Sequence, residues 1–167
     1  MKNNKTLPFS ASDVWAFGVT MWEMFSYGFQ PWAALTGQEI LEAIDDPNRK
    51  RLERPRNCPS DYYKIMLKCW EHDIHLRPSF GQLLTILEEA KPEQVRATQS
   101  SNTFRSGFLD FDVGTVITIL DKNVDGNGNF WNGIRDDNGH IGLFQANQTV
   151  TYLGTIPKTS FNNSAST

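Results

Sequence analysis

The strongest pattern in the sequence is a long apolar stretch near the N-terminus, between Ser12 and Trp32. Ser12 is a favourable N-cap residue, and Asp13 follows where the helix dipole favours an anion. Gly28 and Pro31 supply stop signals, so the stretch predicts a single helix. Apolar residues lie on all sides of this helix and leave no wide polar stripe. We therefore expect protein to surround the helix on most sides.

Three shorter helices are predicted after the first. Residues 37–44, 60–70 and 80–90 carry apolar side chains at helical spacing. Ser60, with Asp61 after it, is predicted to cap the second of these helices, and Ser79 precedes the third. The expected inward face of the last helix is formed by Leu83, Leu84, Ile86 and Leu87.

The run from Arg49 to Arg56, which connects two of the predicted helices, is basic and broken by Pro55. Two interpretations are open for such a run: a solvated loop, or a patch that binds a peptide or a lipid. We interpret it as a solvated loop.

The periodicity changes from helical to alternating beyond a polar segment that runs from Lys91 to Ser106. Asp137-Asn138-Gly139 predicts a hairpin with a type I′ turn, because Asn-Gly tolerates the positive φ that this turn requires. Short strands in so small a unit predict a tight barrel. The predicted fold class is therefore multi-domain, an all-α region followed by a small all-β barrel. The predicted strands are residues 115–120, 130–135, 140–144 and 149–153.

The composition is that of a folded protein without a basic surface for nucleic acid. Of the 167 residues, 39% are hydrophobic and 12% aromatic, which is enough for a packed core, and the formal net charge is -3. No apolar run approaches the roughly 20 residues of a membrane span. The two cysteines, Cys58 and Cys69, are too few for a disulfide framework. We predict a cytoplasmic protein with no nucleic-acid partner and no transmembrane segment.

Two motifs resemble signatures of the protein kinases. Ser12-Asp13-Val14-Trp15-Ala16-Phe17-Gly18-Val19 is similar to the central helix of the kinase C-terminal lobe. Cys69-Trp70, followed by Arg77-Pro78-Ser79-Phe80, resembles the tyrosine-kinase signature of that lobe in order and in gap. The resemblance implies that residues 1–91 are a partial, all-α kinase C-lobe. It also implies that the complete enzyme uses ATP and Mg to phosphorylate protein tyrosine.

Phosphoryl transfer in this family uses further motifs: a Gly-x-Gly-x-x-Gly loop, a Val-Ala-Ile-Lys strand, His-Arg-Asp and Asp-Phe-Gly. We find none of them in this sequence, and the resemblance places all of them upstream of the first helix. We interpret this as truncation rather than decay of a kinase. We therefore predict no catalytic residue, no bound cofactor and no metal in this chain, and no phosphate transfer by the chain alone.

Two residues match family positions that support the catalytic loop. Asp13 resembles the kinase aspartate whose carboxylate accepts backbone N–H bonds from that loop, with an ordinary helix cap as the alternative. Arg77 resembles the arginine that pairs with the glutamate of an Ala-Pro-Glu motif, which this sequence lacks. A buried guanidinium without its carboxylate costs about 3–5 kcal/mol, so we expect the lobe fragment to be marginally stable by itself.

The β region resembles a Src-homology-3 domain. The polar composition predicts a linker at 92–105 and a disordered tail at 157–167, and the resemblance implies a barrel at 106–156. Three motifs carry the resemblance. Leu109-Asp110-Phe111 with Gly114 is similar to the diverging turn of the family, and Phe130-Trp131-Asn132-Gly133 is similar to its Trp-Trp-x-Gly strand. Gly142-Leu143-Phe144-Gln145-Ala146-Asn147 is similar to Gly-Leu-Phe-Pro-Ser-Asn.

Domains of this family bind proline-rich peptides in a groove walled by aromatic rings. The resemblance implies Phe130, Phe144 and Asn147 as groove residues here. Gln145 and Gln148 stand where the family has Pro and Tyr. Weak or atypical peptide binding and a purely structural role are therefore two open alternatives for the barrel.

Two patterns resemble metal sites, and we interpret both as structural. Asp121-x-Asn123-x-Asp125-Gly126 matches the first half of an EF-hand loop, but position twelve is Asn132 and not the bidentate glutamate. Cys69-x-x-His72-x-x-His75 offers only three zinc ligands at the end of a helix.

A tyrosine-kinase lobe followed by a Src-homology-3 domain is the order of the Ack-type non-receptor tyrosine kinases, which this chain resembles. The predicted function is that of the C-terminal part of such a kinase. Its expected partners are protein substrates and proline-rich peptides. The alternative is a non-catalytic interaction protein that acts through its divergent barrel.

Overall fold

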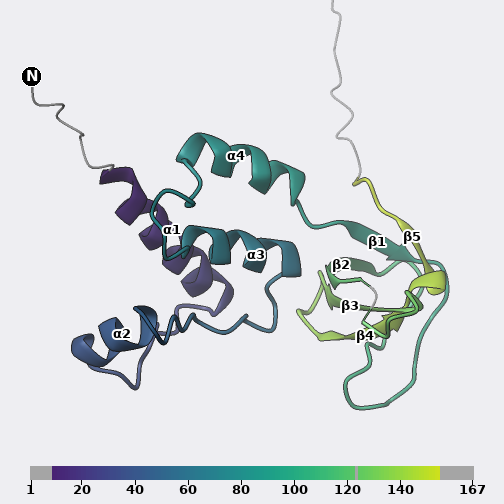
Figure 1. The fold of residues 1–167 in the computed structure, drawn as a ribbon. Coiled ribbons are helices and arrows are strands. Elements are labelled where there is room, and N and C mark those ends of the chain that lie inside the picture. Colours follow the sequence, from purple (N-terminus) through teal and green to yellow (C-terminus); the bar gives the residue numbers. More distant parts are fainter. Residues whose placement is uncertain (1–8, 123, 155–167) are drawn as a thin grey trace, which may run out of the picture.

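The computed structural model describes residues 9–122 and 124–154, which form a helical region and a β-sheet (Figure 1). The helices are α1 (Phe9–Phe25), α2 (Gly37–Ile44), α3 (Ser60–Cys69) and α4 (Phe80–Glu89). In Figure 1, α1 and α3 lie against each other, with α4 above them and α2 below. All four predicted helices are confirmed. None of the described helices is long and apolar enough to cross a bilayer.

The first helix begins earlier than predicted. It starts at Phe9, so Ser12 lies inside the helix and is not its N-cap. Ala11, Val14 and Met21 are buried, whereas Met24 is 72% exposed. The expectation that protein covers most sides of this helix agrees with the described chain, because the remaining large apolar side chains pack against the core: Trp15, Phe17, Val19, Trp22 and Phe25.

The two central helices approach closely at Gly18. A Cβ atom at this position would lie 2.7 Å from Nε1 of Trp70 and 2.8 Å from Cβ of Cys69. The Nε1 atom of Trp70 is buried and has no hydrogen-bond acceptor among the described residues.

Helix α4 turns Leu83 toward the core. Leu84 was expected to face inward as well, but it is exposed. The core contains Val14, Met21, Leu52, Cys58, Ile65, Met66, Cys69, Trp70 and Leu83.

The helix caps agree with the prediction at α4 and differ at α3. Ser79 and Gln82 form a capping box, in which the Gln82 backbone N–H donates to Ser79 Oγ and the Ser79 backbone N–H donates to Gln82 Oε1. At α3 the N-cap position is Pro59, and no side chain caps the helix. Ser60 is the first residue inside the helix, so its predicted capping role is wrong.

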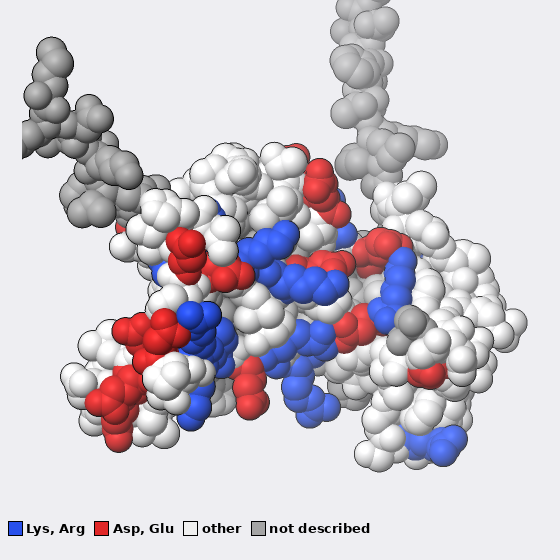
Figure 2. Space-filling model, in the orientation of Figure 1, with Lys and Arg blue, Asp and Glu red and all other residues white. Residues whose placement is uncertain are grey.

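The basic run 49–56 is a loop in which several arginines are bonded to the rest of the chain. Figure 2 shows Lys and Arg side chains gathered across the middle of one face, with acidic side chains on both sides. Arg51 Nε donates to the carbonyl oxygen of Trp70 at 2.8 Å, and Arg54 pairs with Asp121. Arg56 is exposed. The loop prediction is confirmed for the backbone, but Arg51 and Arg54 are structural contacts and not solvated charges.

The β region is one five-stranded antiparallel sheet with the order β4-β3-β2-β1-β5. Its elements are β1 (Gln94–Ala97), β2 (Val116–Asp121), β3 (Phe130–Arg135), β4 (Ile141–Gln145), the short 3-10 helix η1 (Ala146–Gln148) and β5 (Thr149–Thr151). The four predicted strands and the all-β class are confirmed. No pairing between the described strands joins β4 to β5, so closure into a barrel is not found.

Strand β1 lies inside the segment 92–105 that was expected to be a linker. It pairs with β2 on one side and with β5 on the other, and it buries Val95 and Ala97. The segment is polar because only alternate residues reach the core. The predicted tail at 157–167 lies outside the described residues, as do the last two residues of the predicted barrel.

The hairpin between β3 and β4 turns at the predicted place with a different geometry. Gly139 has a φ of 72°, but Asn138 is not among the described residues with positive φ. A type I′ turn requires positive φ at both central residues, so the predicted turn type is wrong. The turn is held by the Gly139 N–H, which donates to the Arg135 carbonyl at 2.9 Å, and by Asn138 Oδ1, which accepts from the His140 N–H.

Candidate functional site

Asp13 lies on the exposed face of α1. Ala16 and Thr20 are exposed at i+3 and i+7 from it, so they share this face. Within the described residues, no group donates a hydrogen bond to the Asp13 side chain. The carboxylate is therefore free to accept backbone N–H bonds from another segment.

Arg77 is held by backbone carbonyls instead of a carboxylate. Its Nε donates to the Glu71 carbonyl at 2.8 Å, and its Nη1 donates to the Ala11 carbonyl at 2.9 Å. The guanidinium groups of Arg77 and Arg51 each lie 4.9 Å from the ring centroid of Trp15. Partial burial lowers the pKa of Arg77. These carbonyl bonds reduce the penalty that the sequence predicted for an unpaired guanidinium.

A cavity of about 360 Å³ opens beside Arg77. Its lining includes Ser12, Trp15, Ile44 and Asp45 but not Asp13. The structure thus places the two predicted support residues on different surfaces around α1 and does not bring them into one pocket.

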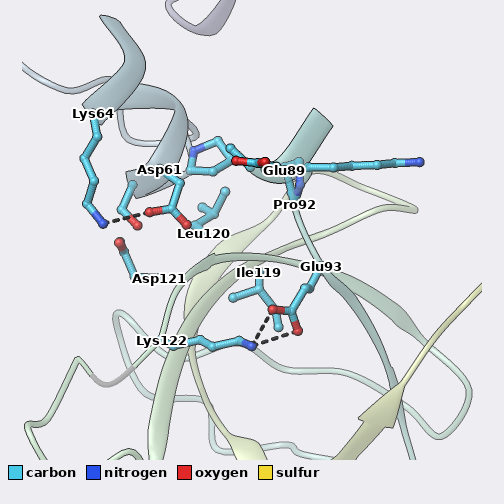
Figure 3. Close-up of a pocket in the computed structure, with 13 residues that line it drawn as sticks. Asp61, Lys64, Glu89, Pro92, Glu93, Ile119, Leu120, Asp121 and Lys122 are labelled. Atoms are coloured by element: carbon cyan, nitrogen blue, oxygen red, sulfur yellow. Dashed lines mark hydrogen bonds and ion pairs between the residues drawn. The ribbon is translucent and has the colours of Figure 1, made fainter. Parts of the chain in front are cut away.

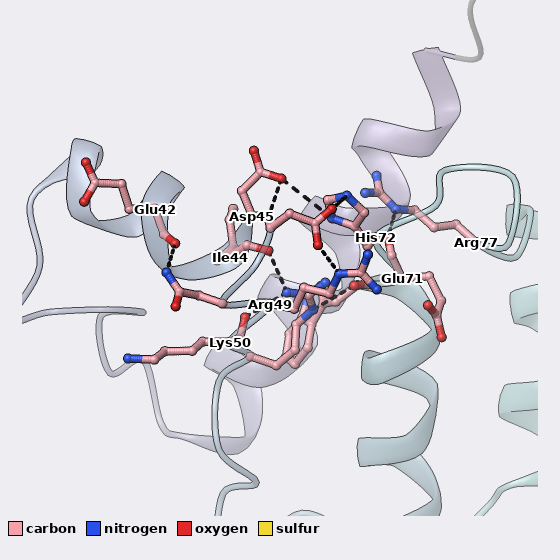
Figure 4. A network of polar contacts seen from close by, with 12 residues as sticks. Glu42, Ile44, Asp45, Arg49, Lys50, Glu71, His72 and Arg77 are labelled. Carbon is pink, nitrogen blue, oxygen red and sulfur yellow. Dashed lines mark hydrogen bonds and ion pairs between the residues drawn. The ribbon is translucent and has the colours of Figure 1, made fainter.

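A polar network of Asp45, Asp46 and His72 lies at the edge of this cavity (Figure 4). His72 Nε2 is 3.2 Å from an Asp46 oxygen, and His72 Nδ1 is 3.8 Å from an Asp45 oxygen. Within the described part of the chain, these are the only three side chains that could converge on one metal ion. Arg49 already donates to Asp46 at 2.5 Å, and this bond lowers the pKa of Asp46. The network therefore fits a surface ion-pair cluster, and we assign it neither Mg nor ATP.

The remaining metal-like patterns do not form sites in the described structure. Cys58 and Cys69 are buried, and burial raises the pKa of the Cys58 thiol to about 12 and that of Cys69 to about 11. Such thiols are poor ligands and nucleophiles at neutral pH. Cys69 does not converge with His72 and His75 among the residues that are described. Asp121 of the EF-hand-like pattern is paired with Arg54, and Asn123 lies outside the described residues.

A second candidate site is a groove on the sheet, where aromatic rings from two segments meet. The rings of Phe108 and Phe130 are 5.8 Å apart in an edge-to-face arrangement. One cavity of about 140 Å³ lies over Phe108, Phe130, Gln145 and Gln148. A second cavity of about 370 Å³ is lined by Phe130, Gln145, Asn147 and their neighbours. Because Phe130 and Gln145 line both cavities, the two form one groove.

The three predicted groove residues lie at this groove in different positions. Phe130 is half-buried and belongs to the wall. Phe144 is 1% exposed, so its ring forms the floor, where it packs against Trp131 with the centroids 6.2 Å apart. Asn147 is exposed at the rim. Phe108 is a further wall residue that sequence reasoning missed, because it is distant in the chain from the motif that carries Phe130.

Arg105 is the only charged side chain among the residues that line either cavity. Its guanidinium lies 5.1 Å from the centroid of Phe108, and no described carboxylate pairs with it. Asp110, in the same loop, accepts backbone N–H bonds from Thr103 and Phe104. The groove thus presents aromatic rings, side-chain amides and one free positive charge. Sequence reasoning also missed Arg105, because no local motif marks it as a groove residue.

Comparisons with known proteins give a family match for the helical region and relatives that match over both regions. Residues 2–87 match the family described as protein tyrosine and serine/threonine kinase. Over 90% of its length, the chain is 48% identical to a Drosophila melanogaster protein named "Activated Cdc42 kinase-like". Over the same share it is 37% identical to an Ack-related non-receptor tyrosine kinase of Caenorhabditis elegans and 36% identical to the human non-receptor tyrosine-protein kinase TNK1. The chain spans only 11%, 14% and 22% of the lengths of these three proteins.

Proposed function

Because this chain belongs to the protein tyrosine and serine/threonine kinase family, as a homologue of the Ack and TNK1 non-receptor tyrosine kinases, we propose that it is the supporting part of a tyrosine-kinase domain. The family implies ATP, Mg and protein substrates for the full enzyme. In a longer protein the ATP phosphate is transferred to a protein tyrosine, and the residues of this chain position the groups that react. The non-receptor class of the worm and human relatives supports a cytoplasmic location.

The observation that carries this proposal is the exposed face of α1. Its exposed residues are Ser12, Asp13, Ala16 and Thr20, with Met24 as the one large apolar side chain among them. An unpaired carboxylate on an exposed helix face can accept hydrogen bonds from another segment. The free carboxylate of Asp13 lies on this helix, and we assign it the support of a catalytic loop through backbone N–H bonds.

Arg77 supports the same proposal from the other side of α1. Its Nε and Nη1 are bonded to carbonyl oxygens, while Nη2 has no partner among the described residues. This nitrogen lies beside a cavity with room for a further side chain. A carboxylate such as the glutamate of Ala-Pro-Glu would complete the fork of bonds that a guanidinium favours.

A chimaera tests whether this part supports catalysis. Residues 2–87 replace the matching segment of human TNK1, and transfer of phosphate to a tyrosine peptide is measured. We expect an active chimaera in which Asp13→Asn lowers kcat by up to about 100-fold, because a displaced catalytic loop misplaces the reacting groups. Glu42→Gln, on the exposed side of α2, is the matched control and should leave kcat unchanged. An inactive chimaera, or an Asp13→Asn variant with full kcat, contradicts the proposal.

The chain by itself gives the complementary test. We expect no transfer from ATP to a tyrosine peptide above the level seen when Mg is omitted, because the motifs that hold the nucleotide are not found in this sequence. Transfer that depends on Mg would show that the chain carries a catalytic site of its own.

A second function, peptide binding in the groove of the sheet, is favoured by the free guanidinium of Arg105. A proline-rich peptide enters such a groove with little conformational entropy to lose. The positive charge of Arg105 attracts an acidic residue beside the prolines of the peptide. It repels a basic residue at the same position.

Two peptides with the same Pro-x-x-Pro core, one flanked by Glu and the other by Arg, separate peptide binding from a structural role. We expect the acidic peptide to bind about two- to fivefold more tightly, the range for exposed charge pairs, and to shift the backbone amide signals of Phe130 and Asn147. Arg105→Gln should remove the preference, whereas Arg56→Gln should retain it. If neither peptide shifts these signals, the role of the sheet is structural.

A further inference from the structure

The helical region and the sheet are connected by a bidentate ion pair between Arg54 and Asp121, which are 67 residues apart in the sequence. Arg54 Nη1 is 2.9 Å from Asp121 Oδ1, and Nη2 is 2.5 Å from Oδ2. The side chains are 30% and 21% exposed, so they are partly shielded from water. A bidentate pair fixes orientation as well as distance. Among the described residues, no other ion pair crosses between the two regions.

The loop that carries Arg54 is itself fixed to the helices. The carbonyl oxygen of Glu53 accepts from Trp22 Nε1 at 2.7 Å, so the loop is bonded to α1. The carbonyl oxygen of Leu52 accepts from the hydroxyl of Tyr63 at 2.7 Å, so the loop is also bonded to α3. Arg54 therefore extends from a backbone that is anchored on both sides.

Asp121 is fixed from the side of the sheet. It is the last residue of β2 and pairs with Asn132 of β3, just after a register shift in that pair of strands. Such an irregularity redirects a side chain at the end of a strand. The backbone beside each partner of the ion pair is therefore bonded within its own region.

The rest of the boundary combines a cavity with apolar contact, because Leu120 of β2 is 2% exposed and lies beside Pro59 and Pro92 at this cavity. The cavity of about 300 Å³ lies between the start of α3, the end of α4 and β2 (Figure 3). The charged side chains around it are paired locally: Lys64 with Asp61, and Lys122 with Glu93, each at 2.7 Å. They do not compete for Arg54 or Asp121. The covalent connection is short, because only residues 90–93 separate α4 from β1.

We infer that Arg54 and Asp121 dock the sheet on the helical region, so that the two regions move as one body. The short connection keeps them close, and the bidentate pair selects one orientation. Phe130 lies on β3 two residues from Asn132, the partner of Asp121 across the strands. The docking therefore holds the groove wall in a fixed direction relative to α1 and α3. This inference does not depend on whether the groove binds a peptide.

Nuclear magnetic relaxation of the backbone ¹⁵N atoms in the 167-residue chain tests the inference. We expect one rotational correlation time for helices and strands in the unmodified chain. Arg54→Glu places two carboxylates opposite each other, and we expect loss of the common value, with a shorter time for the strands than for the helices. Combining Arg54→Asp with Asp121→Arg restores the pair in reverse and should restore the common value.

Arg56→Glu is the matched control, because it makes the same charge change two residues away at an exposed position. It should keep the common correlation time. Asp121→Asn, which preserves the size of the side chain, gives a second reading if Arg54→Glu unfolds the helical region. A single correlation time in both Arg54→Glu and Asp121→Asn overturns the inference. Separate times in Arg56→Glu, or in the reversed pair, also overturn it.

Discussion

The helical region and the sheet expose their apolar residues in different ways. Among the described residues of the helical region, half of the large exposed apolar side chains lie within helices, as for Met24, Leu41 and Leu84, and the other half lie in connecting segments. In the sheet, Val150 is the only one that lies within a described strand, and the others are in the connecting segments. The strands turn their apolar residues into a core around Phe111 and Phe144, whereas some helices also carry exposed apolar side chains. The two regions therefore differ in where their apolar surface meets the solvent.

The largest effect that would sharpen this comparison is expected for Phe144→Ala. Removing a ring that is 1% exposed costs about 3–5 kcal/mol of unfolding free energy, which is close to the whole stability of a small domain. Hydrogen exchange should show lost protection in the strands while α1 and α3 keep theirs. Val150→Ala, on the exposed side of β5, should stay within about 0.5 kcal/mol. Equal loss of protection in strands and helices would show that the sheet is not an independent unit.

A smaller effect, restricted to the helices, is expected for Gly18→Ala. The new methyl group meets Trp70 and Cys69 at distances below 3 Å, and such overpacking costs about 1–3 kcal/mol. Urea unfolding followed by the amide signals of α1 and α3 measures this loss. Gly37→Ala is the control, because its methyl group meets no atom within 4 Å and the residue has no positive φ. A Gly18→Ala variant as stable as this control would mean that α1 and α3 are less tightly packed at Gly18 than the structure shows.

The smallest difference concerns the two serines at helix starts. Ser79→Ala removes a side chain that caps α4 and should cost about 1 kcal/mol. Ser60→Ala removes no capping bond and should stay within about 0.5 kcal/mol. Thermal unfolding of the two variants under identical conditions gives the comparison. Equal losses would indicate that Ser60 also caps its helix.

The sequence predicts the elements of this fold well and their surroundings less well. Apolar spacing locates all four helices, because a helical face must repeat every three to four residues. It misses β1, since four residues that bury only Val95 and Ala97 give too short an alternation to distinguish. It misplaces the cap of α3, because Pro59 occupies the position that Ser60 was expected to take.

For the candidate sites, too, sequence motifs find some residues and miss others. Motifs identify Phe130 and Asn147 because they lie in contiguous, recognisable segments of the chain. Arg54 and Asp121 have no such signal: each is an ordinary charged residue in its own segment, and only the folded chain places them together. The same holds for Arg105, whose importance depends on the absence of carboxylates from the lining of the groove. Contacts between distant segments depend on three-dimensional geometry, which a local pattern does not contain.

The indole of Trp70 makes the contact between α1 and α3 measurable without any label. Its Nε1 proton is buried against the backbone at Gly18 and has no acceptor among the described residues. A proton in that position exchanges with deuterium only when the helices separate. The exchange rate of this one indole resonance in a proton spectrum therefore measures how often the helical region opens.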